Sequence, residues 1–286
     1  MIAVTGVNGL LGSRIAHQLT EDSTPFIGIK RAQSDTTLID HLSINCKNAD
    51  LLDVGALHEA LQGVHTVIHT AALVSFKSND GEQLYRINVE GTRNVVNACL
   101  SLGIPRLIHV SSVAALGRQK GIYQINEDNK WVESKLNSDY AESKYLAELE
   151  VFRGQEEGLK IDIVNPSVIL SQSNWDRSSA QLFKYVWNNK PFYTQGSINY
   201  VDVRDVVAMI GLLLKREPRG ERHIANGGTV PLKDLLTNIA DRLGKKAPWI
   251  RVPGPLISAA AWVESARSWI TGKEPMVTPQ SARTAH

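Results

Sequence analysis

The first sixteen residues constrain the fold of this chain more than any other stretch. They run from an apolar segment into three glycines, and apolar residues then recur at helical spacing. Gly6 permits a tight turn out of a strand, Gly9 lets backbone N–H groups approach a pyrophosphate at a helix N-terminus, and Gly12 permits close helix–strand packing. Glycines alone could form a turn without a ligand, but strand, glycines and helix in this order are the context that a dinucleotide site requires. The chain is therefore predicted to begin with a dinucleotide-binding unit.

Strand-like and helix-like segments alternate along the rest of the chain. Strands are expected at 26–29, 64–69, 106–110, 161–164 and 199–201, and helices at 54–62, 82–102, 138–155 and 203–215. Such alternation predicts an α/β fold with a doubly wound parallel sheet that binds its ligands at the carboxyl ends of the strands. We expect a dinucleotide-binding domain over 1–170, to which 199–225 return. Segments 171–198 and 226–286, with Trp249, Trp262 and Trp269, are expected to form a smaller C-terminal substrate-binding lobe.

Composition excludes several other classes. A chain of 286 residues with 43% hydrophobic content can bury a large core, and a net charge of +2 gives no reason to expect nucleic acid or an acidic partner. No stretch has the length of a membrane span, and a strand at residue 1 leaves no room for a signal peptide. Cys46 and Cys99 are too few for a disulfide framework, and no His pair has zinc-like spacing. We expect a cytoplasmic protein without a metal.

The segment from Tyr140 to Lys144 carries the strongest chemical signal. A Tyr and a Lys four residues apart in a helix project from the same face. A nearby ammonium favours the phenolate, lowers the pKa of the phenol from its usual value of about 10, and makes it a usable proton donor to a carbonyl. An isolated pair of this kind could equally lie on a solvated helix face. Its position after a nucleotide-binding N-terminus and a Ser-Ser pair favours catalysis.

These motifs, in this order, resemble the extended short-chain dehydrogenases/reductases of the NAD-dependent epimerase/dehydratase superfamily, which have a Rossmann-type fold. The resemblance covers nearly the whole chain. It rests on the glycine loop, Asp50-Leu51, His69-Thr70-Ala71-Ala72, Asn88-Val89-Glu90-Gly91-Thr92, Val110-Ser111-Ser112, Tyr140-x-x-x-Lys144, Asn165-Pro166-Ser167-Val168 and residues 200–206.

The resemblance implies a catalytic set. Tyr140 would be the general acid/base, and Lys144 would lower its pKa and hold the nicotinamide ribose. Ser112 matches the serine that binds the substrate oxygen, because it stands five residues before Gly117, whereas Ser111 is expected to cap backbone groups. Asn88 could orient a water for proton relay, or it could be a structural residue of its helix.

The cofactor-binding residues follow from the same motifs. They are Gly6, Asn8, Gly9, Leu10, Leu11, Gly12, Lys30, Arg31, Asp50, Leu51, Thr70, Ala71, Ala72, Tyr140, Lys144, Pro166, Ser167 and Val168. An NAD site asks for Asp or Glu at the end of the second strand, but here Lys30-Arg31 follow it, and cations suit a 2′-phosphate. NADP(H) is therefore the predicted cofactor, with NAD(H) as the alternative if the basic turn is merely exposed.

The surroundings of the catalytic set narrow the reaction. The acidic pair of sugar dehydratases is absent after Ser112, and Leu116-Gly117 replaces the Tyr-Gly of sugar epimerases. The segment 140–148 is more similar to the dihydroflavonol-reductase and 3β-hydroxysteroid-dehydrogenase-like branch, which implies reduction of a ketone, or oxidation of a secondary alcohol, on a hydrophobic small molecule. Ile257, Trp262 and Trp269 are compatible with an apolar lid or with a lobe core. Relatives usually continue beyond a segment similar to 274–278, whereas this chain stops at His286.

Two alternatives come from other classes. A nucleotide-sugar epimerase would use the same Ser-Tyr-Lys triad with tightly held NAD. A redox-sensing protein of the same fold would usually lack the Tyr and the Lys, which this chain has.

Assembly can also be predicted. The expected helices 82–102 and 138–155 carry apolar residues on more than one face: Val95, Val96, Ala98 and Leu100 on the first, and Leu146, Ala147, Leu149 and Val151 on the second. A two-fold homodimer would pair these helices with their symmetry mates. Loose patterning is the alternative explanation.

Overall fold

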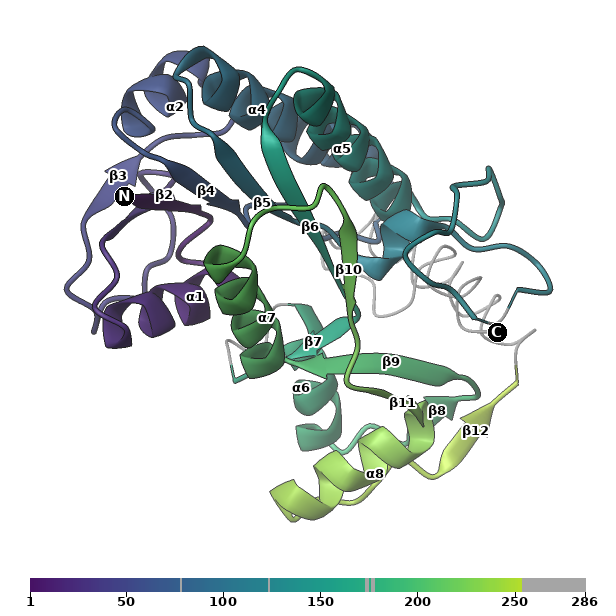
Figure 1. Cartoon of the computed structure of the whole chain (residues 1–286). Helices are drawn as coiled ribbons and strands as arrows, with labels where there is room; N and C mark the ends of the chain where they lie inside the picture. Colours follow the sequence, from purple (N-terminus) through teal and green to yellow (C-terminus); the bar gives the residue numbers. More distant parts are fainter. Residues whose placement is uncertain (78, 123, 173–174, 176–177, 254–286) are drawn as a thin grey trace.

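The computed structural model describes residues 1–77, 79–122, 124–172, 175 and 178–253, and its centre is a seven-stranded parallel sheet (Figure 1). The strand order is β10-β6-β5-β4-β1-β2-β3. The strands are β1 (Ile2–Thr5), β2 (Phe26–Lys30), β3 (Cys46–Asn48), β4 (Thr66–His69), β5 (Arg106–Val110), β6 (Lys160–Pro166) and β10 (Arg222–Ala225). The predicted α/β, Rossmann-type fold is thereby confirmed.

Helices cover both faces of this sheet. One face carries α1 (Leu10–Glu21) and α7 (Val203–Lys215), and the other carries α2 (Val54–Ala60), α4 (Gly91–Ser101) and α5 (Asp139–Glu156). Ala3 and Val4 are neighbours in β1 but belong to two different apolar clusters, because successive strand side chains point to opposite faces. Val4 packs in the cluster of α1 and α7, and Ala3 in that of α2, α4 and α5.

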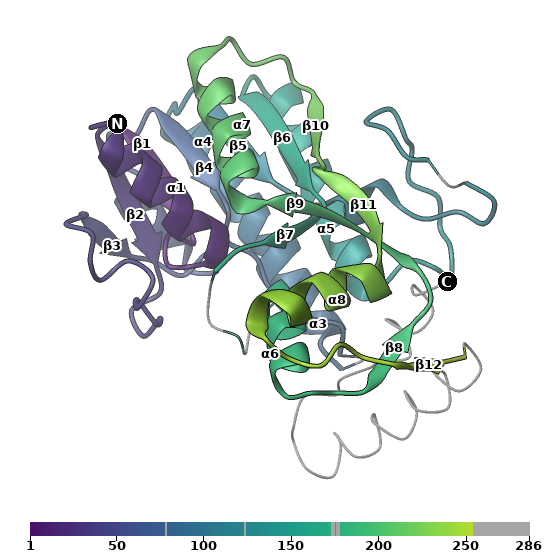
Figure 2. The same ribbon diagram turned by 90° about the horizontal axis from the view of Figure 1, so that it is seen from below.

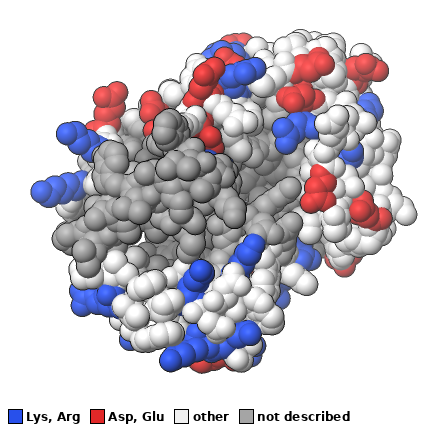
Figure 3. All heavy atoms as spheres, turned by 180° about the vertical axis from the view of Figure 1, so that it is seen from behind, with Lys and Arg blue, Asp and Glu red and all other residues white. Residues whose placement is uncertain are grey.

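A smaller lobe lies beyond the carboxyl edge of the sheet (Figures 1 and 2). Its elements are β7 (Val168–Leu170), η3 (Ser178–Ala180), α6 (Gln181–Trp187), β8 (Phe192–Thr194), β9 (Ser197–Asp202), β11 (Gly228–Pro231), α8 (Leu232–Leu243) and β12 (Ile250–Val252). Strand β9 pairs with β7 and β11, β8 pairs with β12, and a separate core forms around Val186, Leu236 and Ile239. Figure 3 shows the molecule from behind: Lys and Arg prevail at its lower end, whereas basic and acidic side chains are mixed above. Ile257, Trp262 and Trp269 lie outside the described residues.

The segment predicted as one helix over 82–102 is divided. It consists of α3 (Gly81–Leu84), a π-helix η1 (Tyr85–Glu90) and α4. A π-helix turn widens the helix locally and is frequent at functional sites. The widened turn contains Asn88.

Helices α4 and α5 expose fewer apolar residues in the structure than the sequence predicted. Val95, Val96, Ala98, Ala147 and Val151 are all buried, and their clusters face the sheet. Leu149 is the member of the predicted set that is exposed, at 44%. The outer surface of α4 and α5 is largely polar, with Glu150 between Arg93 and Arg153, each 2.8 Å away.

Candidate active site

The parallel register brings the predicted site residues to one edge of the sheet. Thr5 at the end of β1 is level with His69 of β4, and His69 is level with His109 of β5. All these strands run in the same direction, so the loops that follow them meet at their carboxyl ends. The glycine loop, the 70–72 loop, Ser112 and Ser167 therefore lie along one edge.

The glycine loop has the geometry of a phosphate cradle. Gly6 has φ +66°, which an L side chain rarely adopts, and a Cβ there would lie 2.8 Å from the Ala71 Cα. A Cβ at Gly12 would collide with the Gly6 carbonyl. Gly9 is the N-cap of α1 without a side-chain cap, so the first N–H groups of the helix remain available to an anion. The loop fits a pyrophosphate.

The other predicted cofactor residues line the same edge. The Thr70 hydroxyl donates to the Thr5 carbonyl at 2.6 Å and fixes the 70–72 loop against the glycine loop. At the end of β6, the Ser167 hydroxyl is buried and has no partner among the described residues. A buried hydroxyl of this kind is an orphan donor that a ligand at this edge could satisfy. Together with the cradle, it fits a dinucleotide.

In the structure, the Asp50 and Asn8 side chains bond to backbone groups of nearby loops, and Leu51 is buried. Asp50 accepts from the Leu52 amide at 2.9 Å. The Asn8 side chain donates to the Asp35 carbonyl at 2.9 Å, tying the glycine loop to the turn after β2.

That turn carries the two predicted cations. Lys30, the last residue of β2, donates to Asn48 Oδ1 at 3.1 Å, which leaves two of its three donors. Arg31 is exposed, and its side chain makes no hydrogen bond or ion pair in the described part of the chain. Both side chains are available at the predicted position.

Helix α5 carries Tyr140 and Lys144, the predicted catalytic pair. Ser138 caps it by accepting from the Ala141 amide at 3.2 Å, which starts the helix so that Tyr140 and Lys144 fall one turn apart. Ser112 caps the short helix η2 (Val113–Leu116) by accepting from the Ala114 amide at 3.2 Å, and its hydroxyl lies beside the Tyr140 phenol. The structure thus brings together the three residues that the sequence predicted. The Ser111 hydroxyl, for which a capping role was expected, is buried without a partner in the described chain.

The pKa directions at the pair differ from the prediction. Burial raises the pKa of Tyr140 above 10.0, and the Ser112 hydrogen bond opposes this only in part. Burial also lowers the pKa of Lys144 to about 8, opposed by the Glu148 charge. The Lys144 Nζ, one helical turn away, donates to the Val110 carbonyl at 3.0 Å. At neutral pH the phenol is therefore a neutral proton donor.

Asn88 acts as a structural clamp. Its Oδ1 accepts from the Leu73 amide at 2.7 Å, and its Nδ2 donates to the Leu73 carbonyl and to Ser143 Oγ, both at 2.9 Å. Ser143 in turn donates to the Tyr140 carbonyl at 2.8 Å. Both amide protons are used, so of the two predicted roles the structural one agrees better with these contacts.

Four further residues near Tyr140 and Lys144 were given no role from the sequence. Phe76 places its ring 5.7 Å from that of Tyr140, edge to face. Glu148 is buried one turn beyond Lys144, and Asn165 and Arg222 bind it. The spacing of Glu148 after Lys144 was a usable signal. Arg222 is 74 residues away in β10, and nothing in the local sequence pointed to it.

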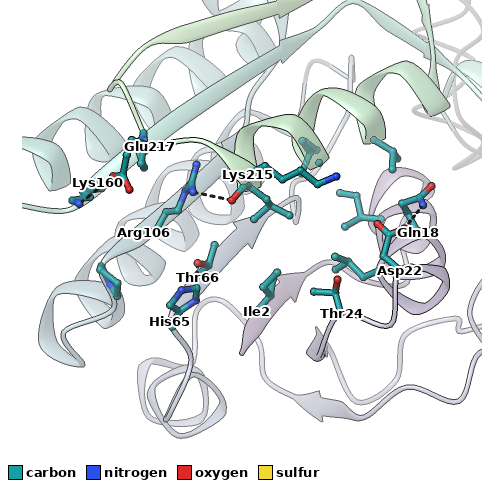
Figure 4. A pocket seen from close by; sticks show the side chains of 18 residues that line it. Ile2, Gln18, Asp22, Thr24, His65, Thr66, Arg106, Lys160, Lys215 and Glu217 are labelled. Carbon is teal, nitrogen blue, oxygen red and sulfur yellow. Dashed lines mark hydrogen bonds and ion pairs between the residues drawn. The ribbon is translucent and has the colours of Figure 1, made fainter.

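A cavity of about 410 Å³ lies elsewhere, between α1 and α7 (Figure 4). Ile2, Thr66 and Arg106, the first residues of β1, β4 and β5, line it, so it opens at the amino edge of the sheet. Arg106 crosses it to the Leu213 carbonyl. It therefore lies at the opposite edge of the sheet from the predicted catalytic residues Tyr140 and Lys144.

Within the described residues, no group of three or more His, Cys, Asp or Glu could hold a metal ion. None of the helices in that part of the chain is long and apolar enough to cross a bilayer.

Comparisons with known proteins agree with this geometry. Residues 2–227 match the family model described as the NAD dependent epimerase/dehydratase family. A Synechocystis sp. protein provisionally named dihydroflavonol 4-reductase is 33% identical over 96% of this chain and 81% of its own. Sterol demethylase protein B of Methylococcus capsulatus is 30% identical over 90% and 79%. The crystal structure of gox2253 superposes with a TM-score of 0.81 at 32% identity, covering 99% of this chain and 87% of the other.

Proposed function

The chain belongs to the NAD dependent epimerase/dehydratase family, and we propose that within it the protein is an NADP(H)-dependent oxidoreductase of ketones or secondary alcohols on hydrophobic small molecules. The observation that carries this proposal is the placement of the Tyr140 phenol beside the Ser112 hydroxyl, with Lys144 one helical turn away, at the carboxyl edge of the sheet. NADP(H), when bound, supplies or accepts the hydride.

The residues of the chain supply the proton and the orientation. Ser112 and Tyr140 donate to the same carbonyl oxygen and stabilise the negative charge that develops on it. The raised pKa of Tyr140 keeps the phenol protonated at neutral pH, so it can give its proton to that oxygen during reduction. The Lys144 ammonium stabilises the phenolate that remains and binds the ribose hydroxyls.

A hydrophobic substrate agrees with the surroundings of Tyr140. Val74, Phe76 and Val168 are exposed by 36–49% on segments that follow β4 and β6. Exposed apolar side chains beside a catalytic phenol offer contact to an apolar substrate. Of the two relatives described above, one is named as a dihydroflavonol 4-reductase and the other as a sterol demethylase protein.

The preference for NADP(H) rests on Lys30 and Arg31. No carboxylate lies at the end of β2 to bind a ribose 2′-hydroxyl, and Arg31 is free to pair with a 2′-phosphate. We further propose that 171–198 and 226–286 act as the substrate-binding lobe, that the protein is a homodimer, and that it works in the cytoplasm.

The test is a panel of carbonyl compounds, including flavanonols, steroids and long-chain 3-keto acids, followed by NADPH absorbance. Turnover of at least one compound with NADPH, and much weaker turnover with NADH, is expected. The second candidate is a nucleotide-sugar epimerase, since the description of the matching family names epimerases. Conversion of UDP-sugars by protein that retains bound NAD, without turnover of the panel, would decide for the epimerase.

A further inference from the structure

Lys144 is a buried cation whose hydrogen bond does not supply a negative charge. It is 2% exposed, and the hydrogen bond of its Nζ goes to the uncharged Val110 carbonyl. An ammonium removed from water is unstable unless an opposite charge acts on it. The groups around it must therefore include a counter-charge.

The titratable neighbours of Lys144 come from three elements, β4, β5 and α5. His69 on β4 and His109 on β5 are fully buried, with ring centroids 5.2 Å apart. Burial lowers the pKa of His69 to about 3 and that of His109 well below its ordinary value, and the Lys144 charge adds to both shifts. Both rings are therefore neutral and supply no negative charge. Tyr140, on α5, is protonated as well.

Glu148, the remaining neighbour on α5, is the acid whose charge raises the pKa of Lys144. Its side chain is 0% exposed, and it follows Lys144 by four residues, so both lie on the same face of the helix. A buried carboxylate needs partners of its own, and Glu148 has two. Asn165 Nδ2 donates to Oε1 at 2.6 Å, and Arg222 Nε donates to Oε2 at 2.8 Å.

These partners connect the carboxylate to the rest of the site. Asn165 Nδ2 also donates to the Ser112 carbonyl at 3.0 Å, so one amide links Glu148 to the backbone of the serine. Arg222, on β10, is held by the Asn129 carbonyl at 3.3 Å and lies over the Phe152 ring at 5.2 Å. The carboxylate is thus fixed from both sides.

We propose that Glu148 is a positioning residue of this site: its carboxylate is the counter-ion that keeps the buried Lys144 protonated, and Arg222 and Asn165 hold it in place. The inference depends on the proposed function only through the role of Lys144. Its test is a titration of Lys144 in the cofactor-free full-length chain, so it can fail while the reductase activity stands, and the reverse.

The titration uses stability. Lys144 loses its proton near pH 8 when folded and near 10.5 when unfolded, so between these values the unfolded state binds more protons and the free energy of unfolding rises with pH. Subtracting the urea-unfolding curve of Lys144→Met from that of the parent protein isolates this rise. The pH at which the rise begins reports the pKa of Lys144 in the folded state.

Two substitutions should move this onset in opposite directions. Glu148→Gln keeps the size and the acceptor for Asn165 but removes the negative charge, so the onset should fall by on the order of one pH unit. Arg222→Gln leaves the carboxylate uncompensated, so the onset should rise. A purely structural pair would lower stability in both variants without opposite shifts. Glu150→Gln is the matched control, because Glu150, also on α5, pairs with Arg93 of α4 and Arg153 of α5 but its side chain is 15% exposed. The onset in this variant should stay near pH 8.

Breaking a buried pair can prevent folding, so the double variant Glu148→Gln/Arg222→Gln, which removes both charges, completes the set. Its onset should lie between those of the single variants. If Glu148→Gln does not fold, the upward shift in Arg222→Gln decides. An onset that stays at the parent value in a folded variant, or that moves the same way in both, would overturn the proposal.

Discussion

Lys144 and Arg31 are the two cations on which the proposed chemistry depends, and their surroundings are opposite. Lys144 is enclosed by two neutral histidines, a backbone carbonyl and a carboxylate that is itself held by an arginine. Arg31 is exposed on a turn and has no such enclosure in the described chain. A buried charge is costly to disturb because each partner loses its compensation, whereas water compensates an exposed one. Substitutions in the Lys144 region should therefore have large effects, and those at the Lys30–Arg31 turn should alter selectivity alone.

Replacing Tyr140, the proposed general acid, should have the largest effect in the buried region. Tyr140→Phe removes the phenolic proton and should lower kcat by roughly 10²- to 10⁴-fold, the usual contribution of a general acid. The affinity for NADPH should stay nearly unchanged, since the hydroxyl acts on the substrate. Stopped-flow turnover and calorimetric NADPH binding provide the two measurements. A loss of NADPH affinity as large as that caused by Lys144→Met would show that the phenol has a different role.

Lys144→Met should damage both measurements at once. In the proposed mechanism the ammonium stabilises the phenolate and binds the ribose, and hydrogen bonds to charged groups contribute about 1.5–3 kcal/mol. We expect a roughly 10- to 100-fold weaker NADPH affinity together with a reduced kcat. Lys160→Met is a suitable control, because Lys160 is an exposed lysine that pairs with Glu217 at 3.4 Å. Unchanged NADPH binding in Lys144→Met would show that Lys144 does not bind the ribose.

The two regions also differ in how far the sequence could predict them. The N-terminal glycine loop and the Tyr140–Lys144 spacing are local patterns, and local patterns determine turns and helix faces. Strands β3 and β10 were not assigned, because three or four residues carry too little periodicity. The π-helix around Asn88 and the Arg222–Glu148 pair arise from tertiary packing, which no spacing in the sequence encodes. The raised pKa of Tyr140 was missed for the same reason, since it follows from burial.

Asn88→Ala should have an intermediate effect, because it removes a clamp and leaves the charges in place. The substitution would leave the half-buried Leu73 amide and carbonyl without their partner, and a typical hydrogen bond contributes about 0.5–1.5 kcal/mol. The 73–77 loop carries Phe76, so we expect KM to rise more than kcat falls. Asn97→Ala, on the outer surface of α4 next to Arg153, is the control and should be close to neutral. A drop in kcat at constant KM would favour the proton-relay role instead.

Arg31→Asp tests the exposed region, where selectivity should change without loss of activity. The substitution removes one cation and repels a 2′-phosphate, so the preference for NADPH over NADH should fall by roughly 10- to 100-fold. The melting temperature and the kcat with NADH should remain close to those of the parent protein, because the Arg31 side chain has no partner among the described residues. Calorimetry with both cofactors measures the change. A parent protein that binds NADH as tightly as NADPH would contradict the proposed preference.

The smallest effect is expected at the outer surface of α4 and α5, where the comparison between buried and exposed positions extends to assembly. If these helices pair across a two-fold axis, Leu149, which is 44% exposed, becomes an interface residue. Leu149→Glu should then change a particle of twice 31.5 kDa into one of 31.5 kDa in light scattering, with little change in kcat. Leu212→Glu, on α7 and 68% exposed, is the matched control and should leave the mass unaltered. A parent protein of 31.5 kDa at micromolar concentration would exclude the dimer, and the surface of α5 would then be solvent-exposed like that of the Lys30–Arg31 turn.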